Sequence, residues 1–162
     1  MAKAKSPIPE GQHTVSIHLV CKNADQAIDF YKKAFGAKEM SRFPGPDGKI
    51  MHATLKLGDA LFFLNDEMPT PQGGKSPLSL GGTPVTINFY TPDSDRIFKQ
   101  AVSAGATEVM PISDQFWGDH YGMLRDPFGH HWAIAHRVED LTPEELAKRG
   151  QESMAKMAQQ NH

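Results

Sequence analysis

The sequence predicts an α+β fold in which two βαβββ units form a curved mixed sheet around a cleft, with the helices outside. Three observations predict it. Strand-like and helix-like hydrophobic periods follow one another in the same order in both halves of the chain. The segments AFGAKE and SAGATE repeat at a spacing of 69 residues, and a Pro/Gly-rich connector over residues 67–84 separates the halves. One such unit cannot cover both faces of its own sheet, so two must pack together.

The first unit is expected over residues 13–66, after a polar, proline-containing leader over residues 1–12. HTVSIHLV alternates apolar and polar residues, which predicts a half-buried strand. NADQAIDFYKKAFGA has apolar residues at helical spacing, with Asn23 or Asp25 as N-cap and a glycine as terminator. Three more strands are expected at KEMSRF, IMHATLKL and ALFFLND, the last two joined across a Gly-Asp turn.

The second unit is expected over residues 85–138, and a C-terminal segment follows over residues 139–162. VTINFY predicts a strand, and SDRIFKQAVSAGATEV predicts a helix that ends at a glycine and continues into a strand. QFWGDHYG predicts a connecting loop, and YGMLR and HHWAIAH a hairpin across DPFG. TPEELAKRG predicts a last helix with Thr142 and Glu145 in a capping box, and the chain beyond Gly150 is expected to fray.

Composition excludes several classes of function. Lysine and arginine total 17 against 19 aspartate and glutamate residues, so no basic stripe points to a nucleic-acid partner or a membrane surface. No apolar run approaches the roughly 20 residues of a membrane span. Cys21 is the single cysteine, which rules out an internal disulfide and a cysteine-rich metal site. These features predict a soluble, cytoplasmic protein.

The two faces of each expected strand differ in chemistry. Period-two alternation gives an apolar face that should pack on the helices and a mixed polar and aromatic face that should line the cleft. We interpret the second face as a surface for a small-molecule ligand. The residues expected to contact that ligand lie on these faces and in the QFWGDHYG loop: His18, His52, Phe63, Asn65, Thr86, Asn88, Tyr90, Trp117, His120 and His131. For Trp117 the alternative is that it anchors its loop, and for His120 that it is simply exposed to solvent.

Other reactive residues have simpler interpretations. Arg125 is suited to binding an anion, although pairing with a local carboxylate is the commoner role. Asp126 is expected to cap its own turn. Cys21 is expected to be structural, because no Cys-His arrangement is evident in the sequence. No glycine-rich loop follows a strand as a nucleotide cofactor would require.

Several motifs carry a family resemblance over about residues 12–142. AIDFYKKAFGA, DGKIMHATLKLGDA, FWGDHYG and DPFGHHW occur in this order. Together they resemble the glyoxalase/bleomycin-resistance/dioxygenase superfamily, also called vicinal oxygen chelate, and within it the PhnB-like, glyoxalase-like proteins. The resemblance implies paired βαβββ units and a homodimer. It does not fix the chemistry, because the superfamily includes lyases, dioxygenases, thiol transferases and proteins that only bind drugs.

The resemblance also implies where a divalent metal would lie. Metalloenzymes of this superfamily take one ligand from the first strand and one from the fourth strand of each half. The matching positions here are about Ser16, Phe63, Thr86 and Ala133. Phenylalanine and alanine cannot ligate a metal, and serine and threonine are poor ligands at neutral pH. We therefore expect no metal at the usual position and no cofactor.

Two alternatives remain open. His18, His52 and His131 share the inward faces, so a displaced site could hold Zn²⁺, Ni²⁺, Mn²⁺ or Fe²⁺ in a lyase or dioxygenase. His130 points away from His131, because adjacent strand residues face opposite sides. The second alternative is an antibiotic-sequestering resistance protein, which ranks lower because no acidic groups are expected around the cleft. No catalytic residue is assigned.

Overall fold

The computed structural model describes residues 3–70 and 74–160, which form two four-stranded mixed sheets with helices. The first sheet has the strand order β1-β4-β3-β2 and the second β5-β8-β7-β6. In each sheet the first and last strands of the unit are parallel, and the other neighbours are antiparallel. The predicted α+β fold of two βαβββ units is therefore confirmed. The strands are β1 (His18–Cys21), β2 (Lys38–Pro44), β3 (Ile50–Leu57), β4 (Ala60–Asp66), β5 (Thr86–Tyr90), β6 (Thr107–Asp114), β7 (Asp119–Arg125) and β8 (His131–Arg137).

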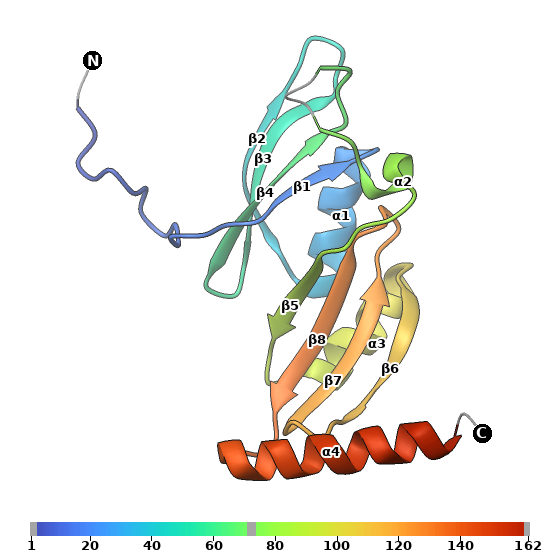
Figure 1. Ribbon diagram of the computed structural model, residues 1–162. Coiled ribbons are helices and arrows are strands. Elements are labelled where there is room, and N and C mark those ends of the chain that lie inside the picture. Colours follow the sequence, from blue (N-terminus) through green and yellow to red (C-terminus); the bar gives the residue numbers. More distant parts are fainter. Residues whose placement is uncertain (1–2, 71–73, 161–162) are drawn as a thin grey trace.

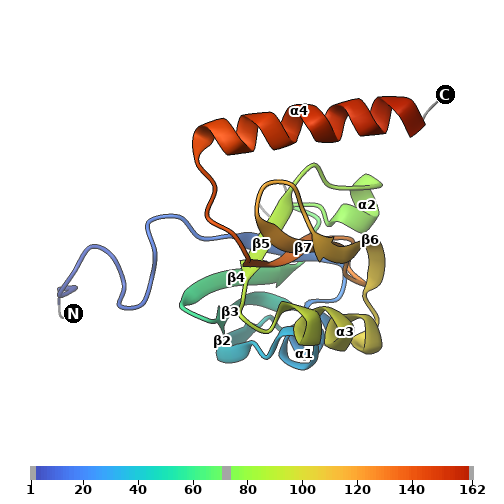
Figure 2. The same cartoon turned by 90° about the horizontal axis from the view of Figure 1, so that it is seen from below.

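Helices α1 (Ala24–Phe35) and α3 (Ser94–Ala104) lie side by side on one face of the sheets (Figure 1). We call this the helix face and the other side the open face. Figure 2 shows α2 (Pro77–Leu80) and α4 (Pro143–Gln160) on the open side. Gly36 and Gly105 end α1 and α3 in the left-handed conformation, with φ of 72° and 119°. This shared turn explains why the two halves repeat a glycine at this position.

One hydrophobic core joins both units on the helix face. Trp132 of β8 is 2% exposed and packs against α1 of the other unit. Its ring centroid lies 4.7 Å from that of Phe35 and 5.5 Å from that of Tyr31. Most of the apolar residues predicted to face the helices are buried, such as Leu19, Leu55 and Leu64. The exceptions lie at or just before the starts of strands: Val15, Ile17, Met51 and Val85. No helix in the described parts of the chain is long and apolar enough to cross a membrane.

Some element boundaries differ from the prediction. β1 begins at His18, because residues 13–17 diverge from β4 after a last hydrogen bond from Phe63 N to Ile17 O. β7 begins at Asp119, because a tight turn closed by Gly118 N donating to Gln115 O returns the chain to the sheet early. The sequence-predicted connector contains the short helix α2, which was not expected.

The C-terminal helix is longer than predicted. The capping box is confirmed, since Thr142 N donates to Glu145 Oε2 and Glu145 N donates to Thr142 Oγ1. However, α4 continues through Gly150 instead of fraying there. Gly150 faces the protein body, where a Cβ would lie 3.5 Å from Phe116. Gly150 therefore lies where α4 packs against Phe116.

Candidate functional site

A pocket of about 350 Å³ lies where the edge strands β1 and β5 of the two sheets approach each other, and we call it the inter-sheet pocket. One side of it is lined by residues 15–17, just before β1, and by the turn between β3 and β4. Its walls are mainly apolar and come from both units: Ile17, Leu19, Phe62, Ile87 and Trp132. Asn88 and Tyr90, two of the sequence-predicted contacts, supply polar groups on the exposed side. An apolar pocket with a few convergent polar groups is typical of small-molecule sites.

Asp119 organises the polar side of this pocket. Asp119 is 2% exposed, and its carboxylate accepts three hydrogen bonds: from the Tyr90 hydroxyl at 2.7 Å, Trp117 Nε1 at 3.1 Å and Arg137 Nε at 2.7 Å. The hydrogen bond to Asp119, with burial, raises the pKa of Tyr90, so this hydroxyl stays protonated at neutral pH. Arg137 was not among the site residues predicted from the sequence. Counting alternate residues from the buried Trp132 along β8 would have placed it on the open face.

Trp117 belongs to this Asp119 cluster and does not line the inter-sheet pocket. Its ring packs edge-on against Phe116 and Tyr121, with centroid distances of 5.0 and 5.4 Å. These contacts and the indole hydrogen bond fix the 115–118 turn to the sheet. The structure therefore favours the interpretation of Trp117 as a loop anchor.

Three predicted residues come together on the open face of the first sheet, and we call them the imidazole cluster. The His18 and His52 ring centroids lie 5.8 Å apart, and both rings contact Phe63 at 6.0 and 5.2 Å. Thr54 of β3 pairs with Phe63 of β4. Asn65 is buried beside them, and its side-chain amide donates to the Asp66 carbonyl at 2.7 Å.

The other predicted residues lie elsewhere. His131 pairs with Thr86 in the second sheet and borders a separate hollow next to α2. His120 lies on the helix face, because β7 begins early and puts Asp119 and His120 on opposite sides. There His120 Nδ1 lies 2.5 Å from Asp114 Oδ1, and Nε2 lies 3.3 Å from Asp95 Oδ2 of α3. The placement of His120 in a loop was wrong, and it does not face the pocket.

The Glyoxalase/Bleomycin resistance protein/Dioxygenase superfamily model matches residues 12–134. The chain belongs to this superfamily. It is 51% identical over 134 residues to an uncharacterized protein of Mycobacterium bovis. The matched region covers 82% of this chain and 88% of the relative. It is similar to the crystal structure of TioX from Micromonospora sp. ML1, with 26% identity and a TM-score of 0.63 over 78% of this chain and 99% of TioX.

A PhnB protein from Bacillus cereus shares the fold, with 19% identity and a TM-score of 0.57 over 76% of this chain and 99% of that one. The resemblance inferred from the motifs is thus confirmed, including the PhnB-like neighbour. The superfamily groups proteins of different chemistry under one fold, so the site residues must decide what this member does.

The residues at the superfamily's metal positions do not fit a metal. The strand register pairs Phe63 with His18 and Ala133 with Asn88, so the side chains next to these two positions on the first strands are those of His18 and Asn88. Neither Phe63 nor Ala133 has a donor atom, which leaves one imidazole and one amide. Among the described residues, no three His, Cys, Asp or Glu side chains group as a metal would require. We therefore derive no chemistry through a metal at this position.

Cys21 does face a histidine, which the sequence analysis did not foresee. Its sulfur lies 3.9 Å from His130 Nε2. Burial raises the pKa of the Cys21 thiol well above its usual value, and burial lowers the pKa of His130. A thiolate–imidazolium pair, which nucleophilic cysteines need, is therefore disfavoured. The expectation that Cys21 is structural is unchanged.

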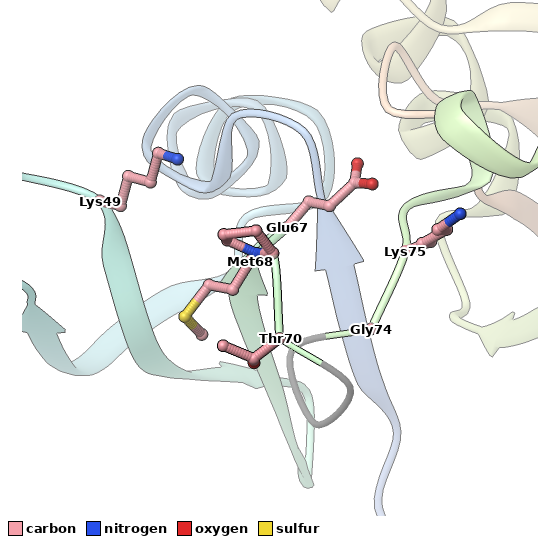
Figure 3. Close-up of a pocket in the computed structure, with 7 residues that line it drawn as sticks. Lys49, Glu67, Met68, Thr70, Gly74 and Lys75 are labelled. Carbon is pink, nitrogen blue, oxygen red and sulfur yellow. The ribbon is translucent and has the colours of Figure 1, made fainter.

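A further hollow lies beside the connector, and Figure 3 shows residues that line it. Glu67 turns towards the side of Lys75 and away from Lys49 in this view. Its carboxylate is held by the hydroxyls of Ser76 and Ser79, at 2.8 and 2.7 Å. These hydrogen bonds lower the pKa of Glu67, with that from Ser79 the larger cause. Glu67 therefore fixes the start of α2 to the end of β4.

Proposed function

We propose that this superfamily member binds a small, largely apolar molecule in the inter-sheet pocket without a divalent metal. The observation that carries the proposal is the pocket itself, which has apolar walls from both βαβββ units and a volume of about 350 Å³. Ligand pockets commonly start at roughly 300 Å³. The ligand would therefore be a compact molecule that buries an apolar body against Ile87 and Trp132.

The polar side of the pocket determines how such a ligand is oriented. The Tyr90 hydroxyl donates a hydrogen bond to Asp119, so its oxygen is left to accept a hydrogen bond from the ligand. Asn88 offers both a donor and an acceptor from its side-chain amide. The matching ligand carries at least one hydrogen-bond donor next to an apolar surface.

A fragment screen by two-dimensional amide NMR tests this proposal. Fragments that bind as proposed shift the amide signals of Ile17, Asn88 and Tyr90 in a saturable way. Tyr90→Phe and Asn88→Ala should each weaken the best fragment about 3–10-fold, because a hydrogen bond contributes about 0.5–1.5 kcal/mol.

Tyr121→Phe is the matched control. Tyr121 lies on the same open face, outside the inter-sheet pocket, so this variant should bind the fragment with unchanged affinity. A screen in which no fragment shifts these three signals, or equal weakening by all three variants, would contradict the proposal.

The setting and assembly are part of the same proposal. Cys21 is a free, buried thiol, which fits a reducing compartment such as the cytoplasm.

We also infer a homodimer, because large apolar side chains such as Phe43 and Val85 stay exposed at 66% and 57%. The fosfomycin resistance protein FosX of Listeria monocytogenes shares the fold at 14% identity, and this likeness does not bear on whether this chain sequesters an antibiotic.

A further inference from the structure

A row of polar side chains crosses the second sheet at the end nearest α2. The register aligns Thr86, His131, Arg125 and Thr107 on four neighbouring strands. Facing residues on neighbouring strands project from the same side of a sheet. The row therefore presents an imidazole and a guanidinium side by side, with a hydroxyl at each end.

A hollow of about 640 Å³ lies over this row and is separate from the inter-sheet pocket. Arg125, His131 and Thr107 line one side. Pro77 and Leu78 of α2 and Pro127 of the DPFG turn supply apolar walls. The turn approaches α2 so closely that a Cβ on Gly129 would lie 2.9 Å from Pro77, so this wall is fixed in place.

Within the part of the chain that the structure describes, Arg125 has no carboxylate to neutralise it. In residues 3–70 and 74–160 its guanidinium makes no hydrogen bond or ion pair. The acidic residue among those lining the hollow is Asp126, and it is 4% exposed. Its two oxygens accept hydrogen bonds from Tyr31, Trp132, Phe128 N and His130 N. Asp126, the local carboxylate that would ordinarily pair with Arg125, is therefore already hydrogen-bonded to these four donors.

We propose that this hollow is a second binding site, for a small molecule with an oxyanion head and an apolar body. The Arg125 guanidinium can donate two parallel hydrogen bonds to a carboxylate or phosphate group. The His131 imidazole keeps at least one N–H donor in either tautomer, and the Thr107 hydroxyl adds another. The apolar body packs on Pro77, Leu78 and Pro127. This site does not depend on the inter-sheet pocket.

Amide NMR titration with three probes at constant ionic strength tests the proposal: acetate, benzoate and inorganic phosphate. A carboxylate site with an apolar wall binds benzoate more tightly than acetate, whereas a phosphate site binds phosphate most tightly. In either case the signals of Thr107, Arg125 and His131 shift and saturate. Arg125→Gln should weaken the best probe at least 10-fold, and Arg125→Lys should weaken it less.

Arg96→Gln is the control, because Arg96 is an exposed arginine on α3 outside the hollow. It should leave the affinity unchanged. Non-saturating shifts with all three probes, or equal binding by the Arg125→Gln and wild-type proteins, would overturn the proposal. Shifts at Asn88 and Tyr90 would instead report the inter-sheet pocket, so the two proposals fail independently.

Discussion

Asp126 and Asp119 are buried carboxylates that hold the second unit together through their hydrogen bonds. Asp126 accepts from two side chains and two backbone amides around the DPFG turn, and Asp119 accepts from three side chains on the open face. An ionised carboxylate offers acceptor positions on both oxygens, which an amide cannot match. Through these hydrogen bonds the two aspartates fix the positions of the groups around them.

Asp126→Asn should destabilise the protein by about 3 kcal/mol, because the amide would leave buried donors such as the Tyr31 hydroxyl and Trp132 Nε1 without an acceptor. The measurement is urea denaturation followed by circular dichroism. Asp29→Asn, an exposed position on α1, is the control and should change stability by less than 0.5 kcal/mol. Equal stability of the two variants would show that the carboxylate does not hold the turn.

His120 should make stability depend on pH. The hydrogen bond with Asp114, and to a lesser degree the interaction with Asp95, raises the pKa of His120. Its contribution is therefore fully present below about pH 6.5, the ordinary histidine value, and is lost as the pH rises through the folded-state value. The titratable ring of His136 also faces His120, with the two ring centroids 5.1 Å apart.

The expected difference in stability between wild type and Asp114→Asn is largest at pH 5.5 and shrinks by pH 8. Chemical denaturation at several pH values measures it, and NMR titration of the His120 ring checks the assignment. A difference that stays constant across this range would contradict the ion pair.

At the scale of elements, two glycines near the C-terminal helix should respond in opposite ways to alanine. Gly150 lies inside α4, and a Cβ there meets Phe116 at an ordinary 3.5 Å. Gly150→Ala should therefore increase helicity at 222 nm and stabilise α4 by up to about 1 kcal/mol. Gly118 has φ of 91°, and a Cβ there would lie 2.6 Å from the Glu139 carbonyl oxygen, so Gly118→Ala should lower Tm. A lower Tm for Gly150→Ala would mean that Phe116 packs on the helix too tightly for a methyl group.

The elements themselves could largely be predicted from hydrophobic period and turn residues. IMHATLKL and ALFFLND match β3 and β4 residue for residue, because the Gly58-Asp59 turn fixes their register. The predicted boundaries are wrong where tertiary contacts determine the end of an element. β1 is shorter than its alternation because residues 13–17 leave the sheet, and α4 runs past Gly150 because Phe116 packs there.

At the scale of the whole molecule, the site could be predicted only in part. Alternation placed His18, His52 and Phe63 on one face, where the structure brings them together. The packing of the two units forms the inter-sheet pocket and keeps His131 apart from His18. The hydrophobic period and the spacing of motifs in the sequence do not encode this packing. β7 begins two residues earlier than predicted, so His120 lies on the helix face of a strand and not in a loop.

The proposed homodimer should have a solution mass about twice the 17.9 kDa of the chain, measured by light scattering after size exclusion. Phe43 is two-thirds exposed and pairs with His52 on the open face, so Phe43→Glu should shift the protein towards the monomer. Phe43→Leu keeps an apolar surface and should remain dimeric. A wild-type protein that is monomeric at every concentration would contradict this assembly.

The central claim is that this superfamily member binds its ligand without the usual metal. Measuring the metal content of the protein tests this claim most directly. The protein is purified without chelator or tag, loaded separately with Zn²⁺, Ni²⁺, Mn²⁺ and Fe²⁺, desalted and analysed for metal per chain. We predict well below one ion per chain with every metal, because Phe63 and Ala133 occupy two of the four ligand positions. One ion per chain, lost in His18→Ala or His52→Ala, would contradict the account and place a displaced metal centre at the imidazole cluster.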